Sequence, residues 1–320
     1  MRDHGGNIDA AIARFGGPSA DWIDLSTGIN RVAYPLPPIP APAWTMLPTR
    51  AATERLIAAA RGAYRTEAAI LPVAGAQAAI QMIPRLSLPG LARVLGPTYN
   101  EHAGALRTSG WSVEEVSTPE ALVGADLAVV VNPNNPDGRV LGTDALHALA
   151  GRVGRLVVDE SFADATPDAS SAHGAIAPGI LVLRSFGKFY GLAGLRLGFV
   201  LGSARDIARL AEMAGPWPVS GAAIEVGAVA LADHAWAQRA RDRLAGEAGR
   251  LDALAAGADW RCVGGTTLFR LYDTPDAAGA QERLARARIW SRIFPYSGTW
   301  LRLGLPGGEA EWTRLAAVLA

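Results

Sequence analysis

The sequence predicts an α/β protein with a mainly parallel sheet, followed by a smaller α+β layer. Two observations lead to this prediction. Apolar runs such as Leu127–Val131 and Leu156–Val158 show no polar alternation, which is typical of strands buried on both faces. Helix-like segments separate these runs up to about residue 200, and such alternation favours a parallel sheet with helices on its faces. After Gly202 the pattern changes to a long helical stretch and then to mixed elements.

Each element is predicted from its own composition and from the turn residues around it. A short helix at 8–15 ends at a pair of glycines, and the proline-rich segment 34–42 is expected to be extended. Further helices are expected at 51–64, 76–86, 101–109, 143–153, 222–256, 277–286 and 309–319. Strands are expected at 70–73, 92–95, 112–116, 127–131, 156–158, 180–183, 197–200, 267–272, 289–293 and 300–305.

The chain is long enough for one large or two modest domains. We expect a large domain over 28–205 and a small domain formed by 1–27 and 206–320, in which the N-terminal helix packs with the C-terminal layer. Hydrophobic residues make up 50% and charged residues 19% of the chain, which is ordinary for a globular protein.

Charge and cysteine content exclude several classes of function. The 30 basic and 30 acidic residues cancel, which argues against nucleic acid or an anionic membrane as a partner. The single cysteine, Cys262, excludes an internal disulfide and a multi-cysteine metal site, and we expect its side chain to be buried. The N-terminus lacks the apolar core of a signal peptide, and no uncharged stretch is an unbroken membrane span. We therefore expect a cytoplasmic protein.

Lys188 is the only lysine in the chain, and it lies in R-S-F-G-K-F-Y-G-L-A-G-L-R-L-G-F between two glycine-rich turns. Arginine stays protonated in proteins, whereas a lysine amine can lose its proton and attack a carbonyl. Compositional bias could leave one lysine by accident. A covalent role, however, explains why arginine does not replace this lysine, and we expect Lys188 to form a Schiff base.

Three further segments lie at predicted strand ends and favour the same site. Asp159 closes a strand in V-V-D-E-S-F, where its carboxylate could keep a pyridine nitrogen protonated. Asn135, in V-V-N-P-N-N-P-D-G, could donate its amide to a phenolate oxygen. Gly75 begins a helix whose free amides suit a phosphate, and Arg196 could add a bidentate contact. Each segment alone also fits an ordinary turn or cap, so the prediction depends on their combination.

S-F-G-K-F-Y-G-L-A-G-L-R-L-G-F, with N-P-N-N-P-D-G and D-E-S-F upstream in this order, resembles the aspartate-aminotransferase-fold (fold type I) enzymes that use pyridoxal 5′-phosphate (PLP). The resemblance spans essentially the whole chain and implies a homodimer. It implies that Lys188 binds PLP covalently and shuttles protons, that Tyr99 stacks on its ring, and that Arg302 takes a substrate carboxylate. The cofactor-binding residues that it implies are Gly75, Ala76, Gln77, Tyr99, Asn135, Asp159, Ser185, Lys188 and Arg196.

Two residues depart from the pattern of this family. Phe162 stands where many members have a tyrosine that touches the ring oxygen, so Asn135 would carry more of that contact. Leu47, in M-L-P, stands where many relatives have a tyrosine that reaches the cofactor phosphate of the partner subunit. That contact between subunits is therefore in question.

H-G-G-N at His4–Asn7, L-S-T-G-I-N at Leu25–Asn30 and P-W-P-V-S at Pro216–Ser220 resemble the L-threonine-O-3-phosphate decarboxylases of cobalamin biosynthesis, in which phenylalanine at the position of Phe162 is usual. The resemblance implies conversion of L-threonine phosphate to (R)-1-amino-2-propanol O-2-phosphate and carbon dioxide. The substrate-binding residues that it implies are His4, Gly5, Gly6, Asn7, Asn30 and Arg302. From the residues alone, a frayed terminal tail is favoured over an anion site at His4.

Two alternative functions stay open on the sequence. A histidinol-phosphate aminotransferase would share the fold, the cofactor motifs and a phosphorylated amino substrate, but it lacks the H-G-G-N start. A regulatory PLP-fold module without catalysis would bring a DNA-binding domain, which the balanced charge disfavours. The sequence does not separate threonine phosphate from serine phosphate, nor does it show whether the protein works in a complex with the downstream enzyme.

Overall fold

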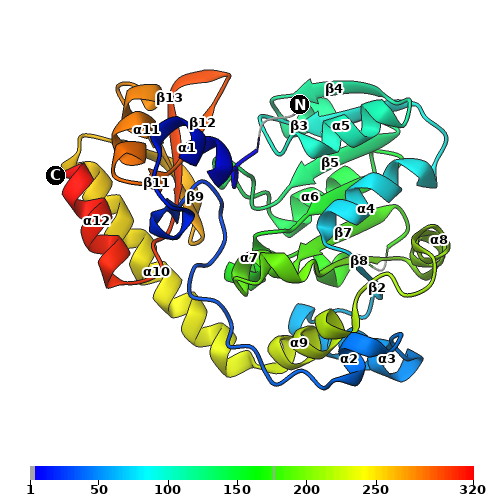
Figure 1. Cartoon of the computed structure of the whole chain (residues 1–320). Coiled ribbons are helices and arrows are strands. Elements are labelled where there is room, and N and C mark those ends of the chain that lie inside the picture. The colour runs from blue at the N-terminus through cyan, green and yellow to red at the C-terminus, as the bar shows by residue number, and fades with distance from the viewer. Residues whose placement is uncertain (1–3, 176) are drawn as a thin grey trace. The chain divides into compact units, whose positions relative to one another are not determined.

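The computed structural model describes residues 4–175 and 177–320, which form two compact units (Figure 1). The larger unit comprises 34–135 and 140–237, and the smaller unit comprises 136–139, 238–320 and the chain up to residue 33. The sequence places the division near residue 205 instead. The larger unit extends further because Ile207 and Leu210 of α8 (Ala204–Ala214) share one apolar cluster with its strands.

A seven-stranded sheet forms the centre of the larger unit, in the order β2-β8-β7-β6-β5-β3-β4. Its strands are β2 (Ala69–Val73), β3 (Leu91–Leu95), β4 (Ser112–Val116), β5 (Leu127–Val131), β6 (Leu156–Asp159), β7 (Ile180–Ser185) and β8 (Gly198–Gly202). Neighbouring strands are parallel except that β8 runs antiparallel to both β2 and β7. The predicted α/β fold with a mainly parallel sheet is therefore confirmed.

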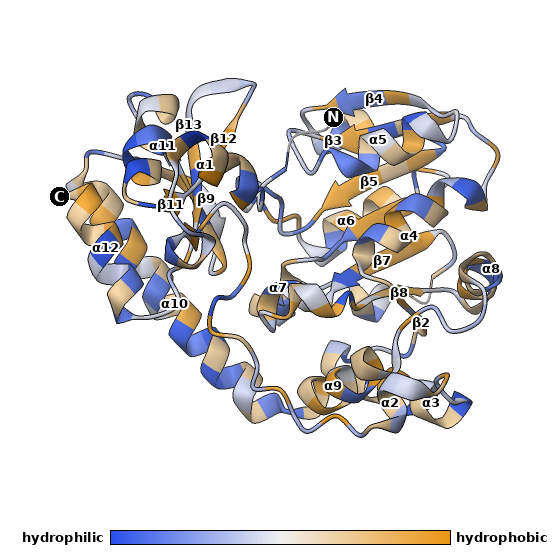
Figure 2. Ribbon diagram, in the orientation of Figure 1, coloured by the Kyte–Doolittle hydropathy of each residue, from blue (hydrophilic) through white to orange (hydrophobic). Residues whose placement is uncertain are grey.

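Helices cover this sheet, and its strands are among the most apolar parts of the chain (Figure 2). The helices of the larger unit, besides α8, are α2 (Pro42–Thr45), α3 (Arg50–Tyr64), α4 (Ala76–Met82), α5 (Glu101–Thr108), α6 (Thr143–Ala150), α7 (Phe186–Phe189) and α9 (Gly221–Ala232). One face packs against α4, α5 and α8, where Ile80 and Leu106 meet Val129 and Val157. Alternate residues of a strand point to opposite faces, so continuous apolar runs are required where both faces are buried.

The smaller unit contains a four-stranded antiparallel sheet in the order β12-β13-β10-β9. Its strands are β9 (Arg261–Thr266), β10 (Phe269–Asp273), β12 (Arg292–Phe294) and β13 (Ser297–Gly304), while β1 (Ile23–Asp24) pairs separately with β11 (Ile289–Trp290). Its helices are α1 (Ile8–Phe15), α11 (Ala277–Arg286), α12 (Glu309–Leu319) and most of α10 (His234–Gly257). The N-terminal helix packs in this layer, where Ala11, Trp22 and Ala285 form one cluster.

Strand β9 is absent from the sequence prediction because two glycines, Gly264 and Gly265, interrupt its apolar pattern. These glycines allow close backbone packing: a Cβ on Gly264 would overlap the carbonyl oxygen of Asp137. The expectation of a buried Cys262 is wrong, since its side chain is exposed on β9, an edge strand. In the part of the chain that the structure describes, no helix has the length and apolar character needed to cross a bilayer.

Candidate active site

The candidate site lies at one edge of the seven-stranded sheet, within the larger unit. Val131, Asp159 and Ser185 are the last residues of β5, β6 and β7. Gly198, the first residue of β8, pairs with both Ser185 and Val73, because β8 runs antiparallel to its two neighbours. The start of β8 and the carboxyl ends of the adjacent strands therefore meet at the same edge, where sheets of this kind bind ligands.

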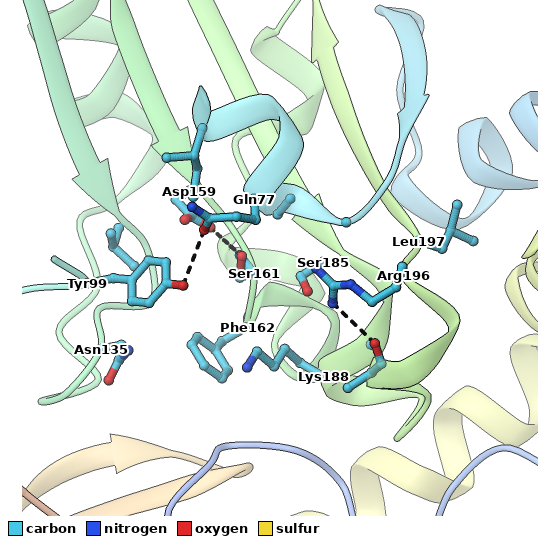
Figure 3. Close-up of a pocket in the computed structure, with 16 residues that line it drawn as sticks. Gln77, Tyr99, Asn135, Asp159, Ser161, Phe162, Ser185, Lys188, Arg196 and Leu197 are labelled. Carbon is cyan, nitrogen blue, oxygen red and sulfur yellow. Dashed lines mark hydrogen bonds between the residues drawn. The ribbon is translucent and has the colours of Figure 1, made fainter. Parts of the chain in front are cut away.

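A cavity of about 150 Å³ opens at this edge, and Figure 3 shows the side chains around it. It is lined by Gly75, Ala76, Gln77, Ile80, Tyr99, Val131, Asn135, Asp159, Ser161, Phe162, Ser185, Gly187, Lys188, Ala193, Arg196 and Leu197. All nine residues that the sequence analysis assigns to the cofactor are in this set. The fold thus brings together residues that are far apart along the chain.

Lys188 lies in α7, a single helical turn that follows β7 directly. Its neighbours Phe186, Gly187 and Phe189 are buried, which anchors the turn. Gly187 is needed there, because a Cβ would come within 2.6 Å of the Ala193 Cα. The Lys188 Nζ lies 5.7 Å from the centre of the Phe162 ring, at the cavity (Figure 3). The only lysine of the protein therefore presents its amine to this cavity.

Asp159 is held as a carboxylate by His102 and Ser161. His102 Nε2 lies 2.7 Å from Asp159 Oδ2, and the amide and Oγ of Ser161 both donate to Oδ1. Burial by itself raises the pKa of Asp159, but the hydrogen bond and charge of His102, together with the bonds from Ser161, outweigh burial and lower the pKa below its ordinary value. The cavity thus contains a buried negative charge.

Another part of the cavity carries donors suited to an anion. Gly75 precedes α4 with φ of 75°, a left-handed conformation that favours glycine. Arg196 packs against it so closely that a Cβ on Gly75 would lie 2.6 Å from Arg196 Nη2. Arg196 Nη1 donates to the Ala193 carbonyl, which orients the guanidinium, and Ser185 lines the same cavity. The first amides of α4, a guanidinium and a hydroxyl are a donor set that suits a phosphate.

Tyr99 is fixed at the cavity by its neighbours. Its hydroxyl donates to Gln77 Oε1 at 3.3 Å, and Gln77 Nε2 donates in turn to Glu101 Oε2 at 2.9 Å. The Tyr99 ring also packs edge-on against the His102 ring, with 6.2 Å between their centres. These contacts hold an aromatic face beside the buried carboxylate (Figure 3).

Only the last asparagine of N-P-N-N-P-D-G lines the cavity. Asn132 bonds with both backbone groups of Leu141, and Asn134 bonds with Thr98 and with the Pro97 carbonyl. The first two asparagines of the motif therefore stabilise the loop. Asn135 lines the cavity instead. The motif combines two structural residues with one residue at the candidate site.

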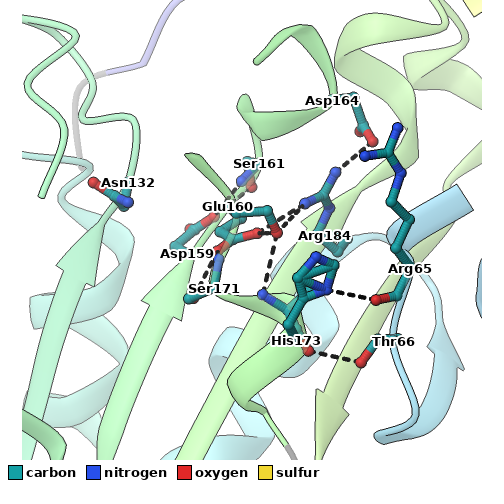
Figure 4. A network of polar contacts seen from close by, with 12 residues as sticks. Arg65, Thr66, Asn132, Asp159, Glu160, Ser161, Asp164, Ser171, His173 and Arg184 are labelled. Carbon is teal, nitrogen blue, oxygen red and sulfur yellow. Dashed lines mark hydrogen bonds and ion pairs between the residues drawn. The ribbon is translucent and has the colours of Figure 1, made fainter. Parts of the chain in front are cut away.

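A buried ionic network lies directly after Asp159 and directly before Ser185 in the chain (Figure 4). Arg184 forms ion pairs with Glu160 and Asp164, and all three side chains are buried. Burial by itself lowers the pKa of Arg184, but the charges of Asp164 and Glu160 outweigh it and raise the pKa. Because breaking such a pair leaves an uncompensated buried charge, the network should hold the ends of β6 and β7 in place.

Arg302, the predicted carboxylate ligand, belongs to the smaller unit. It lies on β13 with 6% of its surface exposed, and its Nη2 donates to the Ser26 carbonyl at 2.6 Å. Arg292 of β12 pairs with it across the sheet. Burial, and then the positive charge of Arg292, lower the pKa of Arg302 to about 10. Two adjacent arginines, one of them buried, form a site where an anion would be favourable.

The N-terminal segment, which we define as His4–Asn7, also lies in the smaller unit. Its Gly6 amide donates to Ser26 Oγ at 2.7 Å, and Asn7 Oδ1 caps α1 by accepting from the Ala10 amide. The N-terminal segment and Arg302 therefore both form hydrogen bonds with Ser26. Gly6 and Asn7 both have clear structural roles there.

Asn30 is almost completely buried in the smaller unit, with 2% of its surface exposed. Its Oδ1 accepts hydrogen bonds from Arg243 Nη2 and from the Val32 amide. The Asn30 side chain therefore connects the backbone at Val32 with Arg243 of α10.

The sequence analysis assigns no role to His102, Ser161 or Arg292. His102 stands in E-H-A-G, at the second position of the helix predicted over 101–109 and close in the chain to Tyr99. Ser161 stands two residues after Asp159, a spacing typical of an Asx turn. Arg292 and Arg302 are charged residues within predicted apolar strands. A charged residue within a predicted buried strand is unusual, and this signal could have identified Arg292 as a candidate site residue.

The chain is similar to known proteins over nearly its whole length. Residues 46–319 match the family described as “Aminotransferase class I and II”. This chain belongs to that family. Within it, the chain is 45% identical to a threonine-phosphate decarboxylase of Sinorhizobium sp., over 99% of this chain and 97% of that protein. It is also 45% identical to a threonine-phosphate decarboxylase of Pseudomonas aeruginosa, over 100% of this chain and 97% of that protein.

A solved aminotransferase structure has the same fold. The histidinol-phosphate aminotransferase of Sinorhizobium meliloti, solved in complex with pyridoxal 5′-phosphate, superimposes with a TM-score of 0.86. The match covers 100% of this chain and 94% of that chain at 21% identity. At this identity the likeness shows the fold alone, so the fold-type I architecture is confirmed while the reaction has to be argued separately.

Substitution of His102 should change the pH dependence of activity. In His102→Leu the hydrogen bond to Asp159 is lost, so the pKa of that carboxyl should rise and the acid limb of the pH–rate profile should move to higher pH. We expect kcat to fall about 10- to 100-fold, because a bond to a buried charge is lost. His102→Gln, which can donate from a similar position, should lie closer to the wild type. Equal profiles for the His102→Leu and wild-type enzymes, measured between about pH 5 and 9, would contradict this role.

Proposed function

We propose that this protein uses PLP to decarboxylate L-threonine O-3-phosphate. The observation that carries the proposal is the 45% identity, over nearly the whole of both chains, to two threonine-phosphate decarboxylases. The expected products are (R)-1-amino-2-propanol O-2-phosphate and carbon dioxide, which would supply the aminopropanol linker of cobalamin. We also propose a cytoplasmic location, which a chain with one cysteine supports.

The larger unit has a cavity whose residues fit PLP. A Cβ on Gly75 would lie 2.6 Å from Arg196 Nη2, so glycine is needed for this guanidinium to pack against the start of α4. Arg196, Ser185 and the first amides of α4 would hold the phosphate, and Asp159 would pair with the ring nitrogen. Lys188 is the only residue that could hold the cofactor through an imine, since the chain has no other lysine.

Bound PLP would supply an electron sink for the pair released when the carboxylate leaves the substrate. The remaining roles belong to side chains of the protein. Asp159, kept ionised by His102 and Ser161, would hold a proton on the ring nitrogen. The Lys188 amine is the group that we assign to return a proton to the substrate Cα after carbon dioxide leaves. Tyr99 and Phe162, which line the cavity, would provide ring surfaces that orient the cofactor and exclude water.

Arg302 is proposed to bind the substrate carboxylate, and His4 the substrate phosphate. Decarboxylation requires the Cα–carboxylate bond to stand perpendicular to the plane of the electron sink, whereas transamination requires the Cα–H bond there. Anchors at both ends of the substrate fix this angle, so the choice of reaction depends on them. Arg292 is a second candidate for the phosphate, because it pairs with Arg302 across the sheet.

The decisive experiment is a carbon dioxide release assay with PLP-loaded protein and L-threonine phosphate, without 2-oxoglutarate. We expect stoichiometric release and formation of the aminopropanol phosphate, with O-phosphoserine as a parallel substrate to measure the preference between the two. Histidinol phosphate with 2-oxoglutarate tests the aminotransferase alternative. Transamination of histidinol phosphate without decarboxylation of threonine phosphate would overturn the proposal. PLP binding without turnover of any of these compounds would favour the non-catalytic module.

Replacement of Arg302 should weaken substrate binding more than it slows chemistry. We expect Arg302→Met to raise KM by at least about 100-fold, since a charged pair with the substrate is lost. Arg302→Lys, which keeps a charge but not the planar fork, should raise KM about tenfold. A KM that is unchanged in the Arg302→Met variant would exclude the assignment.

The protein is further proposed to form a homodimer through a surface of the larger unit that includes Trp44, Met46 and Leu47. Between 64% and 67% of the surface of each of these apolar residues is exposed. Beside them lies a groove of about 260 Å³ between α2, α3 and α9. Exposed apolar clusters of this kind mark interaction sites in globular proteins. Trp44 and Met46 shortly precede Leu47 in the chain. Position 47 is the one from which a tyrosine of many relatives reaches the partner subunit.

The proposed interface can be tested by placing negative charges on this surface, which should prevent dimerisation. We expect Trp44→Glu combined with Met46→Glu to shift the protein from dimer to monomer in analytical ultracentrifugation. Leu88→Glu is the matched control, because Leu88 is 90% exposed and lies outside this surface, so that variant should sediment like the wild type. A monomeric wild-type protein at micromolar concentration would contradict the proposal.

A further inference from the structure

Ser26 lies where three segments of the smaller unit meet. Its Oγ accepts a hydrogen bond from the Gly6 amide at 2.7 Å and donates to Asp24 Oδ1 at 2.6 Å. Its own amide donates to the same carboxylate oxygen at 2.8 Å. Its carbonyl accepts from Arg302 Nη2 at 2.6 Å. Ser26 is fully buried, with 0% of its surface exposed, and its hydroxyl, amide and carbonyl are all hydrogen-bonded.

The N-terminal segment packs on Ser26 as closely as a backbone can. A Cβ on Gly5 would overlap the Ser26 carbonyl oxygen and would lie 3.2 Å from Ser26 Oγ. The carbonyl that orients Arg302 is therefore the same carbonyl against which Gly5 packs. A movement of either the segment or the arginine would change the surroundings of the other.

Asp24 holds Ser26 in this arrangement. It is the last residue of β1 and pairs with Trp290 of β11, so its backbone is fixed by a strand. Its carboxylate accepts both the amide and the hydroxyl of Ser26, which sets the hydroxyl rotamer toward the carboxylate. The lone pairs of Oγ are then available to the Gly6 amide. The negative charge of Asp24 also interacts favourably with Arg302.

We propose that Ser26 is a positioning residue that couples docking of the N-terminal segment to the orientation of Arg302. The inference rests on the proposed function, in which the segment and Arg302 bind the two anionic groups of one substrate. Loss of the Ser26 hydroxyl releases the Gly6 amide and removes one hydrogen bond from Asp24. The segment then undocks, and the two substrate anchors are no longer presented together.

Steady-state kinetics of the PLP-loaded protein with threonine phosphate test this coupling. We expect Ser26→Ala to raise KM roughly tenfold with a much smaller change in kcat, the effect of one lost buried hydrogen bond. Gly5→Ala should give the same change, because it displaces the segment and leaves every atom of Ser26 in place. The double variant should be no worse than either single variant, since both act on one contact. The matched control is Gly246→Ala in α10, where a Cβ meets nothing within 4 Å.

A second measurement does not depend on activity. Hydrogen–deuterium exchange of the PLP-loaded protein should show faster exchange at the Gly6 amide in both Ser26→Ala and Gly5→Ala, with Gly246→Ala like the wild type. Failure of the wild type to decarboxylate threonine phosphate would remove the proposed function, while the exchange result would still report on docking. Unchanged exchange at Gly6, or additive effects of Ser26→Ala and Gly5→Ala on KM, would overturn the coupling.

Discussion

Lys188→Ala is expected to abolish decarboxylation and to remove every covalent attachment of PLP. The chain has no second lysine, so no other ε-amine can take over the attachment. We expect kcat to fall by at least about 10⁴-fold, because in the proposed mechanism one group both holds the cofactor and transfers the proton. Borohydride reduction followed by mass spectrometry should show one PLP adduct in the wild type and none in the variant.

Lys188→Arg is the control for this experiment, because it keeps a long basic side chain at this position but removes the nucleophilic amine. It should bind PLP without covalent attachment and should be as inactive as the alanine variant. Gly187 and the buried phenylalanines around position 188 stay in place, so both variants should fold. A reductively trapped adduct in Lys188→Ala would show that the cofactor is not attached at this residue.

Asp159→Asn is the second change with a large expected effect. The amide keeps the shape of the side chain but cannot hold a proton on the ring nitrogen, so the electron sink should weaken. We expect kcat to fall about 10²- to 10⁴-fold. Asp168→Asn, at a side chain that is 96% exposed, should leave kcat unchanged. Wild-type turnover by Asp159→Asn would contradict the role of the carboxylate.

The same variant gives a stability measurement that is independent of turnover. The pKa of Asp159 is lowered in the folded protein, so its ionisation stabilises the fold at pH values above the ordinary carboxyl pKa of about 3.9. That contribution is lost as pH falls through the lowered folded-state pKa. The difference in the free energy of unfolding between wild type and Asp159→Asn should therefore shrink in acid. Urea unfolding of the cofactor-free proteins between about pH 3 and 7 would measure it.

The fold could be predicted from the sequence because its strands are buried on both faces. Leu127–Val131 and Leu156–Asp159 have no polar alternation, and each is buried along its whole length. By contrast, β9 could not be predicted, since its glycines pack against another backbone segment and carry no apolar pattern. The position of α8 could not be predicted either, because its place in the larger unit depends on Ile207 and Leu210 reaching the sheet.

Asp159 and Asn135 could be proposed as cofactor residues from their places at strand ends, whereas Tyr99 and Ser185 are implied only by the family resemblance. The residues that support them could not be predicted. His102 controls Asp159 from a helix that begins more than fifty residues earlier in the chain. Ser26 joins Gly6 to Arg302, and nothing in L-S-T-G-I-N distinguishes this serine from a turn residue. Contacts between residues that are distant in sequence exist only in the folded chain.

The sequence by itself determined the sheet, the family resemblance and the single lysine available for covalent chemistry. Burial on both faces requires continuous apolar strands, and only a deprotonated amine can form the imine, so both features appear in the residue types. The tertiary structure decided the ionisation of Asp159, the exposure of Cys262 and the shared contact of Gly6 and Arg302 at Ser26. These depend on burial and on distances of a few ångströms between distant segments, which no local pattern encodes.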